Sequence, residues 1–235
     1  MIEEILLLSD PALIVDLKAV LRTANPHLVV TPIVERAQLD ERCLGSLETV
    51  RLLSFGSDII VPASVLARLG GGAYNFHPGP PTYPGRYPST FFLYEGGKRF
   101  GSTVHVMVGK VDAGPINFVA WFEVPEGLDC VALNRLSFQS LMGLFVKLAP
   151  HLAFHDEPLS RSDDVWSGRT TTQQDFNDLC NLPSDVSEAE FKRRYRAIGE
   201  GPDHALEITL FGHRFHLDNH HAAPDVMIGG IKCET

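Results

Sequence analysis

Short aliphatic runs alternate with helical patterns along the first third of the chain, and this alternation constrains the fold more than any other feature. Runs typical of buried strands lie at residues 5–8, 28–30, 52–55 and 73–76. After the first run, Asp10-Pro11 places an N-cap before a proline at the first helical position. Leu13, Leu17, Val20 and Leu21 then repeat at helical spacing. Alternating strands and helices predict an α/β sheet with helices on both faces.

The middle of the chain continues this pattern around a loop. A short helix is predicted at 63–69, ended by the three glycines at 70–72. Residues 77–88 are rich in Pro and Gly and predict a loop. Strands follow at 102–108 and 116–122, and Asp129 is expected to cap a long helix that ends near His151. We therefore expect one main domain over residues 1–155.

The remaining residues, 156–235, predict a small C-terminal α+β subdomain. Residues 156–186 are polar, show little periodicity and predict an irregular connection. Ser187 and Glu190 fit a capping box for a helix whose apolar face carries Phe191, Tyr195 and Ile198. Segments 207–211 and 214–217 then predict a hairpin.

Charge and composition narrow the function classes. The chain has 235 residues and a net charge of −9, of which residues 151–235 contribute −7 (8 Lys and Arg against 15 Asp and Glu). Such a tail repels phosphate polymers, so we expect no nucleic-acid partner. No apolar run approaches the ~20 residues of a membrane span, and the start lacks a signal-peptide pattern, so we expect no membrane partner and a cytoplasmic location. The separated cysteines (Cys43, Cys130, Cys180 and Cys233) are interpreted as free thiols.

Two segments concentrate polar chemistry. In the first, Asn75 and His77 lie two residues apart on a predicted strand, so their side chains point to the same side. In the second, Asp112 lies in a glycine-flanked loop that can bring its carboxylate toward them. An amide donor, an imidazole and a carboxylate suit acyl transfer to an amine. Each residue alone is also compatible with a structural role, and an Asp in such a loop is commonly a turn residue.

The two segments together resemble the signature of the 10-formyltetrahydrofolate-dependent formyltransferases. That family's pattern is Asn-x-His-Pro, a proline-rich loop, Gly-x-Thr-x-His and, seven residues after this His, Asp-x-Gly-x-Ile. The matching positions here are Asn75, His77, Pro78, Gly101, Thr103, His105, Asp112, Gly114 and Ile116. The resemblance implies the Rossmann-like α/β fold of these formyltransferases and 10-formyltetrahydrofolate as co-substrate, with no metal.

The resemblance also implies roles for particular residues. The Asn75 amide would hold the formyl oxygen, His77 would move a proton, and Asp112 would help deprotonate the attacking amine and tune His77. His105 is expected to have mainly a structural role. The folate is expected against two loops, through Ile60, Val61, Pro62, Val108, Gly109, Val111 and Gly114.

The chain departs from the family after His-Pro, and this bears on the acceptor. The common Ser-Leu-Leu-Pro is replaced by Gly79-Pro80-Pro81-Thr82, followed by Tyr83-Pro84-Gly85. The resulting Pro-Pro-x-Tyr-Pro-Gly form is similar to one in members resembling sugar N-formyltransferases. No glycine-rich phosphate loop follows the first strand, and the tail is short and acidic. These features favour a small amine acceptor, with a nucleotide-linked amino sugar as our first choice and Tyr83, Arg86 and Tyr87 as candidate contacts. A homodimer is expected by analogy.

Several alternatives remain open. The chain could be a formyltetrahydrofolate hydrolase, or a catalytically silent folate- or nucleotide-binding module. The basic run Lys192, Arg193, Arg194 and Arg196 fits either a diphosphate contact or, more commonly, a solvated helix face. His213, His216, His220 and His221 resemble a metal cluster, but their spacing mixes strand faces and a turn, so we expect no zinc site.

Overall fold

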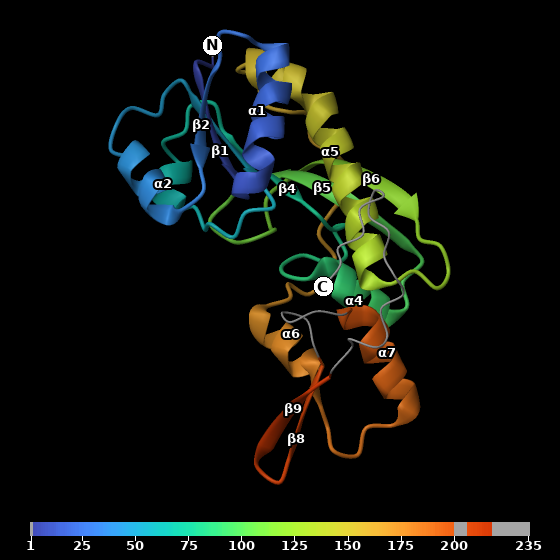
Figure 1. Cartoon of the computed structure of the whole chain (residues 1–235). Helices are drawn as coiled ribbons and strands as arrows, with labels where there is room; N and C mark the ends of the chain where they lie inside the picture. The colour runs from blue at the N-terminus through green and yellow to red at the C-terminus, as the bar shows by residue number, and fades with distance from the viewer. Residues whose placement is uncertain (1, 200–205, 218–235) are drawn as a thin grey trace, which may run out of the picture.

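A six-stranded sheet forms the centre of the computed structural model, which describes residues 2–199 and 206–217 (Figure 1). The strand order is β2-β1-β3-β4-β5-β6. Strands β2, β1, β3 and β4 pair in parallel, whereas β5 is antiparallel to both β4 and β6. The bounds are β1 Glu4–Ser9, β2 Val29–Ile33, β3 Val50–Phe55, β4 Ala73–His77, β5 Arg99–Val106 and β6 Ile116–Glu123.

Helices cover both faces of this sheet, which confirms the predicted fold class. Ile5 and Leu7 of β1 pack into one core with α1 and α5, and Leu6 and Leu8 pack into a second core with α2 and α3. A strand buried on both faces needs apolar residues at every position, which explains the unbroken aliphatic run. The bounds are α1 Pro11–Ala24, α2 Arg36–Arg42, α3 Ala63–Leu66, α4 Pro88–Glu95, α5 Cys130–Phe154, α6 Gln173–Cys180 and α7 Glu188–Ile198.

The predicted helix starts are confirmed by their caps. The side chains of Asp10, Asp129 and Ser187 each accept a hydrogen bond from a backbone N–H of the helix that follows. At α5 the bond from Ala132 N to Asp129 Oδ1 is 2.7 Å long. These bonds satisfy amide groups that the first helical turn leaves without an internal partner.

Some local predictions are wrong. Residues 173–182, expected to be irregular, form α6 and the short strand β7, Asn181–Leu182. Thr172 and Asp175 make a reciprocal capping box there, and Phe176 and Leu179 bury one face, but eight residues are too few to show a clear period. Helices α2 and α4 were not predicted, and the helix expected at 63–69 ends at Leu66.

A smaller cluster of elements lies beyond the sheet (Figure 1). Phe91 of α4, Phe176 of α6 and Ile198 of α7 share one apolar core. The predicted hairpin is confirmed as β8, Glu207–Leu210, and β9, His213–His216, which form a three-stranded sheet with β7. Helix α4 precedes residue 155 in the chain, yet it packs against α7, which follows it. The predicted domain boundary at residue 155 therefore stays a prediction.

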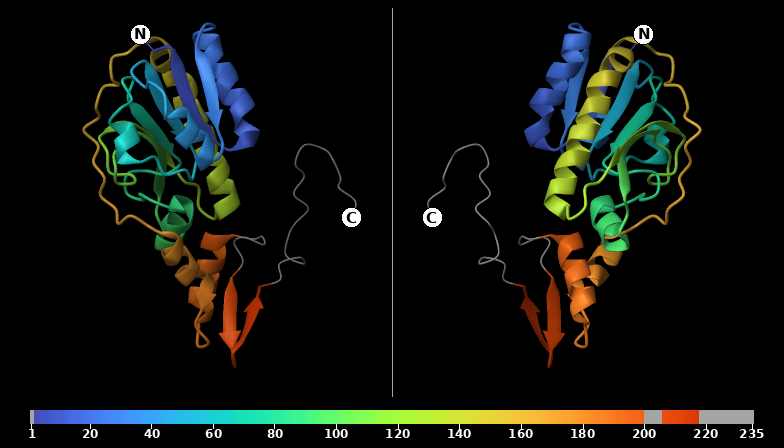
Figure 2. Two further views of the ribbon diagram at one scale, coloured as in Figure 1. Left: turned by 90° about the vertical axis from the view of Figure 1, so that its left-hand side faces the viewer. Right: turned by 90° about the vertical axis from the view of Figure 1, so that its right-hand side faces the viewer.

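The connection from α5 to α6 is long and extended. Figure 2 shows it descending on the side of the sheet away from α5. It hydrogen-bonds to the sheet edge, where the Ser162 amide donates to the Ile116 carbonyl at 2.8 Å. This path brings residues 162–172 to the loops at the end of β4 and β5.

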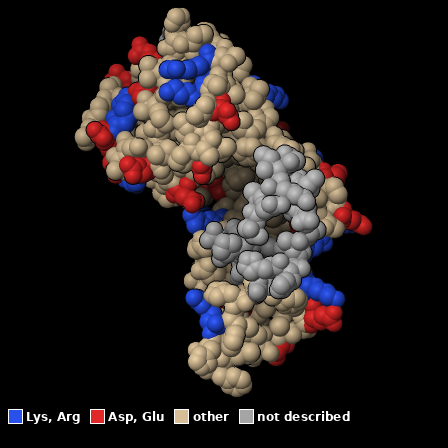
Figure 3. Space-filling view, viewed as in Figure 1, with Lys and Arg blue, Asp and Glu red and all other residues tan. Residues whose placement is uncertain are grey.

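The surface and the helices bear on possible partners. On the face seen in Figure 3, basic and acidic side chains are interspersed over the body that holds the sheet. None of the helices within the described residues is long and apolar enough to span a membrane.

Candidate active site

The antiparallel pairing of β4 with β5 brings the two predicted motifs together. Asn75 lies directly opposite His105, and His77 lies opposite Thr103. Opposite residues of an antiparallel pair project to the same face, so the Asn75 and His105 side chains meet. Their Nδ2 and Nε2 atoms are 3.2 Å apart. The Thr103 hydroxyl donates to the Gly79 carbonyl at 2.7 Å and so holds the start of the following loop.

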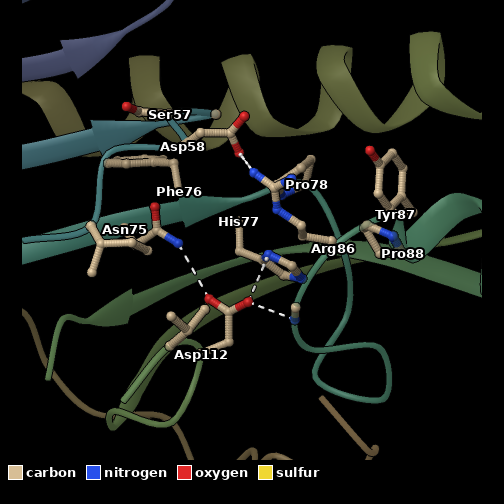
Figure 4. Close-up of a pocket in the computed structure, with 14 residues that line it drawn as sticks. Ser57, Asp58, Asn75, Phe76, His77, Pro78, Arg86, Tyr87, Pro88 and Asp112 are labelled. Carbon is tan, nitrogen blue, oxygen red and sulfur yellow. Dashed lines mark hydrogen bonds and ion pairs between the residues drawn. The ribbon is translucent and has the colours of Figure 1, made fainter. Parts of the chain in front are cut away.

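Asp112 is the point where these groups converge (Figure 4). Its Oδ2 accepts a 2.7 Å hydrogen bond from the Gly85 amide and lies 3.4 Å from His77 Nδ1. Its Oδ1 lies 3.1 Å from His105 Nε2 and 3.4 Å from Asn75 Nδ2. The backbone of Asp112 has a φ of 43°, a conformation that Asp and Asn tolerate better than other side chains. The predicted residues Asn75, His77 and Asp112 therefore form one cluster.

The environment of Asp112 keeps its carboxyl group ionised. Burial alone would raise its pKa, since only 6% of the residue is exposed. The attraction of His77, the contact with His105 and the Gly85 amide outweigh burial and lower the pKa to about 2. A group with this pKa is a weak base at neutral pH, so its negative charge is a fixed feature of the site.

His77 is placed to hold a proton next to that charge. Its Nε2 donates to the Tyr83 carbonyl at 3.1 Å, and its Nδ1 faces Asp112. Burial lowers the pKa of His77, while the attraction of Asp112 opposes this. At neutral pH the ring is therefore neutral, with a proton on Nε2 and an acceptor at Nδ1. A proton taken up at Nδ1 would lie between the ring and the Asp112 carboxylate.

Gly79 makes room for this histidine. A Cβ atom at position 79 would lie 2.6 Å from His77 Nε2 and 2.6 Å from Pro88 Cβ. The serine that is common in the resembling family at this position would need both neighbours to move. Glycine at position 79 therefore fits the close approach of His77 and Pro88.

Two adjoining cavities open on either side of Asn75 and Asp112. The first has a volume of about 280 Å³ and is lined by residues that include His77, Arg86 and Tyr87. The second, of about 80 Å³, is lined by residues that include His105 and Met107. The two cavities share Ser57, Ile60, Asn75, Val111 and Asp112.

The second cavity gathers most of the residues predicted to contact a folate. Ile60, Val61, Val108, Gly109 and Val111 all line it. Pro62 and Gly114 are not among its described lining residues: Pro62 is the N-cap of α3, and the Gly114 carbonyl accepts a hydrogen bond from Trp166. Gly114 also approaches β5 closely, because a Cβ atom there would lie 1.8 Å from the Val106 carbonyl oxygen.

The residues predicted to contact the acceptor divide into two groups. Arg86 and Tyr87 line the first cavity. The Arg86 guanidinium lies 2.7 Å from Asp58 Oδ1, and the Gln173 side-chain oxygen accepts from both Arg86 and the Tyr87 hydroxyl at 2.8 Å. Tyr83 meets the site through its carbonyl instead, since its hydroxyl donates to Glu95 and its ring packs on Phe92.

Several residues at the site were not predicted. Trp166 lies with its ring centre 5.0 Å from that of His105 and 5.9 Å from that of His77. Gly85 and Thr171 are joined by an isolated β-bridge. Trp166 is an isolated aromatic residue in a polar segment, and this could have marked it as a contact with the rest of the protein. The positions of Asp58 and Thr171 depend on long-range pairing that local sequence does not reveal.

The basic run on α7 mostly makes contacts within the protein. Lys192 pairs with Glu188, and Arg193 and Arg194 pair with Glu190. Arg194 also donates to the carbonyls of Asp178, Leu179 and Asn181, and Arg196 donates to that of Leu128. These contacts fit a structural role at the helix surface.

The histidine-rich end of the chain is only partly described. His213 and His216 lie on β9, and His216 faces Glu207 at 3.7 Å. His220 and His221 lie outside the described residues. Among residues 2–199 and 206–217, no group of three His, Cys, Asp or Glu side chains is placed to hold a metal ion.

Comparison with known proteins shows which family the region around this site is similar to. Residues 45–139 match the family model described as formyl transferase. The methionyl-tRNA formyltransferase of Thermotoga sp. (strain RQ2) is 40% identical over 102 residues, which cover 40% of this chain and 31% of that protein. The match thus spans less than a third of that curated relative. The resemblance to formyltransferases that the sequence motifs indicated is thus confirmed. Residues 45–139, which include Asn75, His77 and Asp112, are therefore similar to the formyl transferase family.

Solved structures of N-formyltransferases share the fold of this chain. A sugar N-formyltransferase from Shewanella sp. superposes with a TM-score of 0.74 at 19% identity, over 91% of this chain and 96% of that one. An N-formyltransferase from Helicobacter canadensis, solved with folinic acid and dTDP-3-aminofucose, gives a TM-score of 0.64 at 16% identity, over 90% of this chain and 85% of that one. The fold similarity extends beyond the residues that match the family model.

The charge of Asp112 predicts a measurable pH dependence of stability. A carboxyl group whose pKa is lowered on folding stabilises the folded state when ionised, so this contribution is complete above about pH 4 and is lost as pH falls toward about 2. Asp112→Asn removes the charge and keeps a residue that tolerates positive φ. Between about pH 5 and about pH 2, we expect the free energy of unfolding to fall by about 2 kcal/mol more in the wild type than in the variant.

Urea titrations of both proteins at a series of pH values measure this difference. Because the two chains differ at one side chain, the other titrating groups contribute nearly equally to both curves. Parallel curves across this range would contradict the account of Asp112 as a paired, buried carboxylate.

Proposed function

We propose that this protein transfers a formyl group from 10-formyltetrahydrofolate to the amine of a small acceptor. The observation that carries the proposal is the position of Asn75 and Asp112, which lie at the junction of two cavities with His77 beside them. A transfer reaction needs a donor and an acceptor on either side of its polar groups. The similarity of residues 45–139 to the formyl transferase family supports the same chemistry.

The second cavity suits the flat ring system of a folate. Ile60, Val108 and Val111 are exposed by 62%, 41% and 47%, although all three are apolar, and they face the same cleft. Exposed apolar side chains that gather at a cleft are typical of a ligand site. The cavity of about 80 Å³ is smaller than a usual ligand pocket of roughly 300 Å³ or more, so the 108–111 loop would move outward on binding.

The residues of the cluster divide the chemistry among them. The amine nitrogen forms a bond to the formyl carbon and loses a proton, while the bond from that carbon to N10 of the folate breaks and tetrahydrofolate leaves with a proton on N10. The Asn75 amide nitrogen carries two hydrogens: one lies toward Asp112 Oδ1 and His105 Nε2, at 3.4 and 3.2 Å, and we assign the other to the formyl oxygen. Such donors stabilise the negative charge that develops on that oxygen.

His77 and Asp112 then act as a pair. The neutral His77 can accept a proton at Nδ1, and the fixed charge of Asp112 stabilises the imidazolium that results. This assigns the proton to His77 and the charge balance to Asp112. Asp112 also fixes Asn75 and His105 on its other oxygen.

For the acceptor, we propose an amino sugar linked to a nucleotide. The first cavity, at about 280 Å³, has room for one sugar ring but not for a whole sugar nucleotide. Arg86 lies at its mouth with 43% of its side chain exposed, where its planar guanidinium can meet a phosphate group. Its partner Asp58 is 86% exposed, and such an exposed ion pair is weak enough to be exchanged for a ligand anion. The complex of the Helicobacter canadensis protein with a nucleotide-linked amino sugar supports this class.

The direct test is the conversion of 10-formyltetrahydrofolate to tetrahydrofolate, followed by absorbance. The matched arms are nucleotide-linked amino sugars, the same sugars without the nucleotide, and no amine. We expect turnover that depends on the amine and is fastest with a nucleotide-linked sugar. Turnover at the same rate without any amine would favour a hydrolase, and folate binding without turnover in any arm would favour a binding module.

Arg86 gives a test of the phosphate contact. Arg86→Gln should raise KM for the nucleotide-linked acceptor about 10- to 100-fold and change kcat little, because it removes a charged hydrogen bond made in the bound state. Arg99→Gln is the matched control, since Arg99 is similarly exposed and lies 4.0 Å from Glu123 on the neighbouring strand β6. An unchanged KM in Arg86→Gln would remove this residue from the acceptor site.

The expectations of a homodimer and of a cytoplasmic location stay predictions.

A further inference from the structure

Residues 162–172, which we call the strap, pair with the loop that follows His77. The Thr171 amide donates to the Pro84 carbonyl at 2.9 Å, and the Arg86 amide donates to the Thr171 carbonyl at 2.9 Å. The Ser167 amide donates to the Pro81 carbonyl at 3.2 Å. The strap therefore acts like an added strand along this loop, residues 79–88, which we call the proline loop.

The approach of the two segments is too close for side chains at two positions. A Cβ atom on Gly85, where φ is 96°, would lie 2.2 Å from the Thr171 carbonyl oxygen. A Cβ atom on Gly168 would lie 1.8 Å from the Thr82 carbonyl oxygen. Glycine at both positions lets the backbones meet.

Thr171 adds a side-chain contact at the centre of this pairing. Its hydroxyl oxygen lies 2.5 Å from the Arg86 carbonyl and 3.2 Å from the Pro84 carbonyl. The residue is only 7% exposed. The hydroxyl has one hydrogen, which it donates chiefly to the nearer Arg86 carbonyl, and this buried bond holds the turn around Gly85 in one shape.

That turn carries two of the contacts that define the site. The Gly85 amide donates to Asp112, and the Tyr83 carbonyl accepts from His77. Both groups belong to the backbone between Tyr83 and Gly85, so their positions depend on the course of the loop. The Thr171 hydroxyl contacts the carbonyls of Pro84 and Arg86, which lie on either side of Gly85.

Trp166 makes the corresponding contact on the other side of the site. Its Nε1 donates to the Gly114 carbonyl at 2.8 Å, two residues beyond Asp112 in the chain. Its ring packs against those of His77 and His105 at interplanar angles of 70° and 87°. The strap thus contacts both loops that bear the polar cluster.

We infer that the strap is part of the active site, in which Thr171 and Trp166 are positioning residues that hold the Gly85 amide and the Asp112 loop against the catalytic groups. The inference rests on the proposed formyl transfer for its kinetic consequence, but the structural coupling can be measured without any substrate. It gives a function to a segment that sequence reasoning interpreted as an irregular connection.

The first experiment compares Thr171→Val, which removes the hydroxyl and keeps the shape, with Thr171→Ser, which keeps the hydroxyl. Thr170→Val is the matched control, because the Thr170 hydroxyl makes no hydrogen bond within the described part of the chain. Hydrogen exchange should become about 10-fold or more faster at the Gly85 and Arg86 amides in Thr171→Val. Exchange in the central sheet should stay unchanged, which separates a local effect from unfolding.

The same variants are then assayed for formyl transfer. We expect kcat to fall on the order of 10- to 100-fold in Thr171→Val, with KM for the folate changed little, and to recover in Thr171→Ser. Trp166→Phe, which keeps a ring but loses the donor, should lower kcat in the same way. Trp121→Phe on β6 serves as its control.

The outcomes separate the two claims. Faster loop exchange together with lower kcat, both rescued by Ser, supports the inference. Wild-type exchange at Gly85 and Arg86 in Thr171→Val overturns it, as does faster exchange with full turnover. If the wild type transfers no formyl group to any acceptor, the proposed function fails, while the exchange data still decide whether Thr171 holds the loop.

Discussion

The buried negative charge of Asp112 is the interaction on which the rest of the site depends. A charge removed from water is costly unless hydrogen bonds and opposite charges compensate for it. Here the compensation comes from the Gly85 amide of the proline loop and from His105 of β5, and it increases when His77, at the end of β4, takes up a proton. Moving any of these segments would leave the carboxylate less well compensated, so the positions of all three depend on the Asp112 side chain.

The sheet supplies the geometry that makes this possible. The change from parallel to antiparallel pairing occurs between β3–β4 and β4–β5, and it sets Asn75 directly opposite His105. The chain then leaves β5, turns through the Asp112 loop and returns as β6. Asn75 and Asp112 consequently lie where two cavities meet, which is the arrangement that a transfer between two ligands requires.

Much of this could be predicted from the sequence, for identifiable reasons. Asn75 and His77 share a strand, so their common side follows from a period of two. The first strand and helix follow from an unbroken aliphatic run and from the Asp10 cap. The family pattern also predicted that Asp112 lies near Asn75 and His77, although forty residues separate the first and last residues of that pattern.

The remainder depends on contacts between distant segments. Helix α6 has only eight residues, so its apolar face is too short to stand out from a polar connection. Thr171 and Trp166 contact backbone carbonyls, those of Pro84, Arg86 and Gly114. Every residue has a backbone carbonyl, so such contacts cannot be predicted from residue types. Tyr83 was predicted as an acceptor contact from its residue type, whereas the contact of its carbonyl with His77 depends on the course of the loop.

The most direct test of the account is the rate of formyl transfer by Asp112→Asn, measured together with its affinity for the folate. If the carboxylate balances the charge that His77 gains, the variant should bind folate within about 2- to 3-fold of the wild type and transfer the formyl group on the order of 100-fold more slowly. Full activity in a folded Asp112→Asn protein would contradict the central place given to this charge.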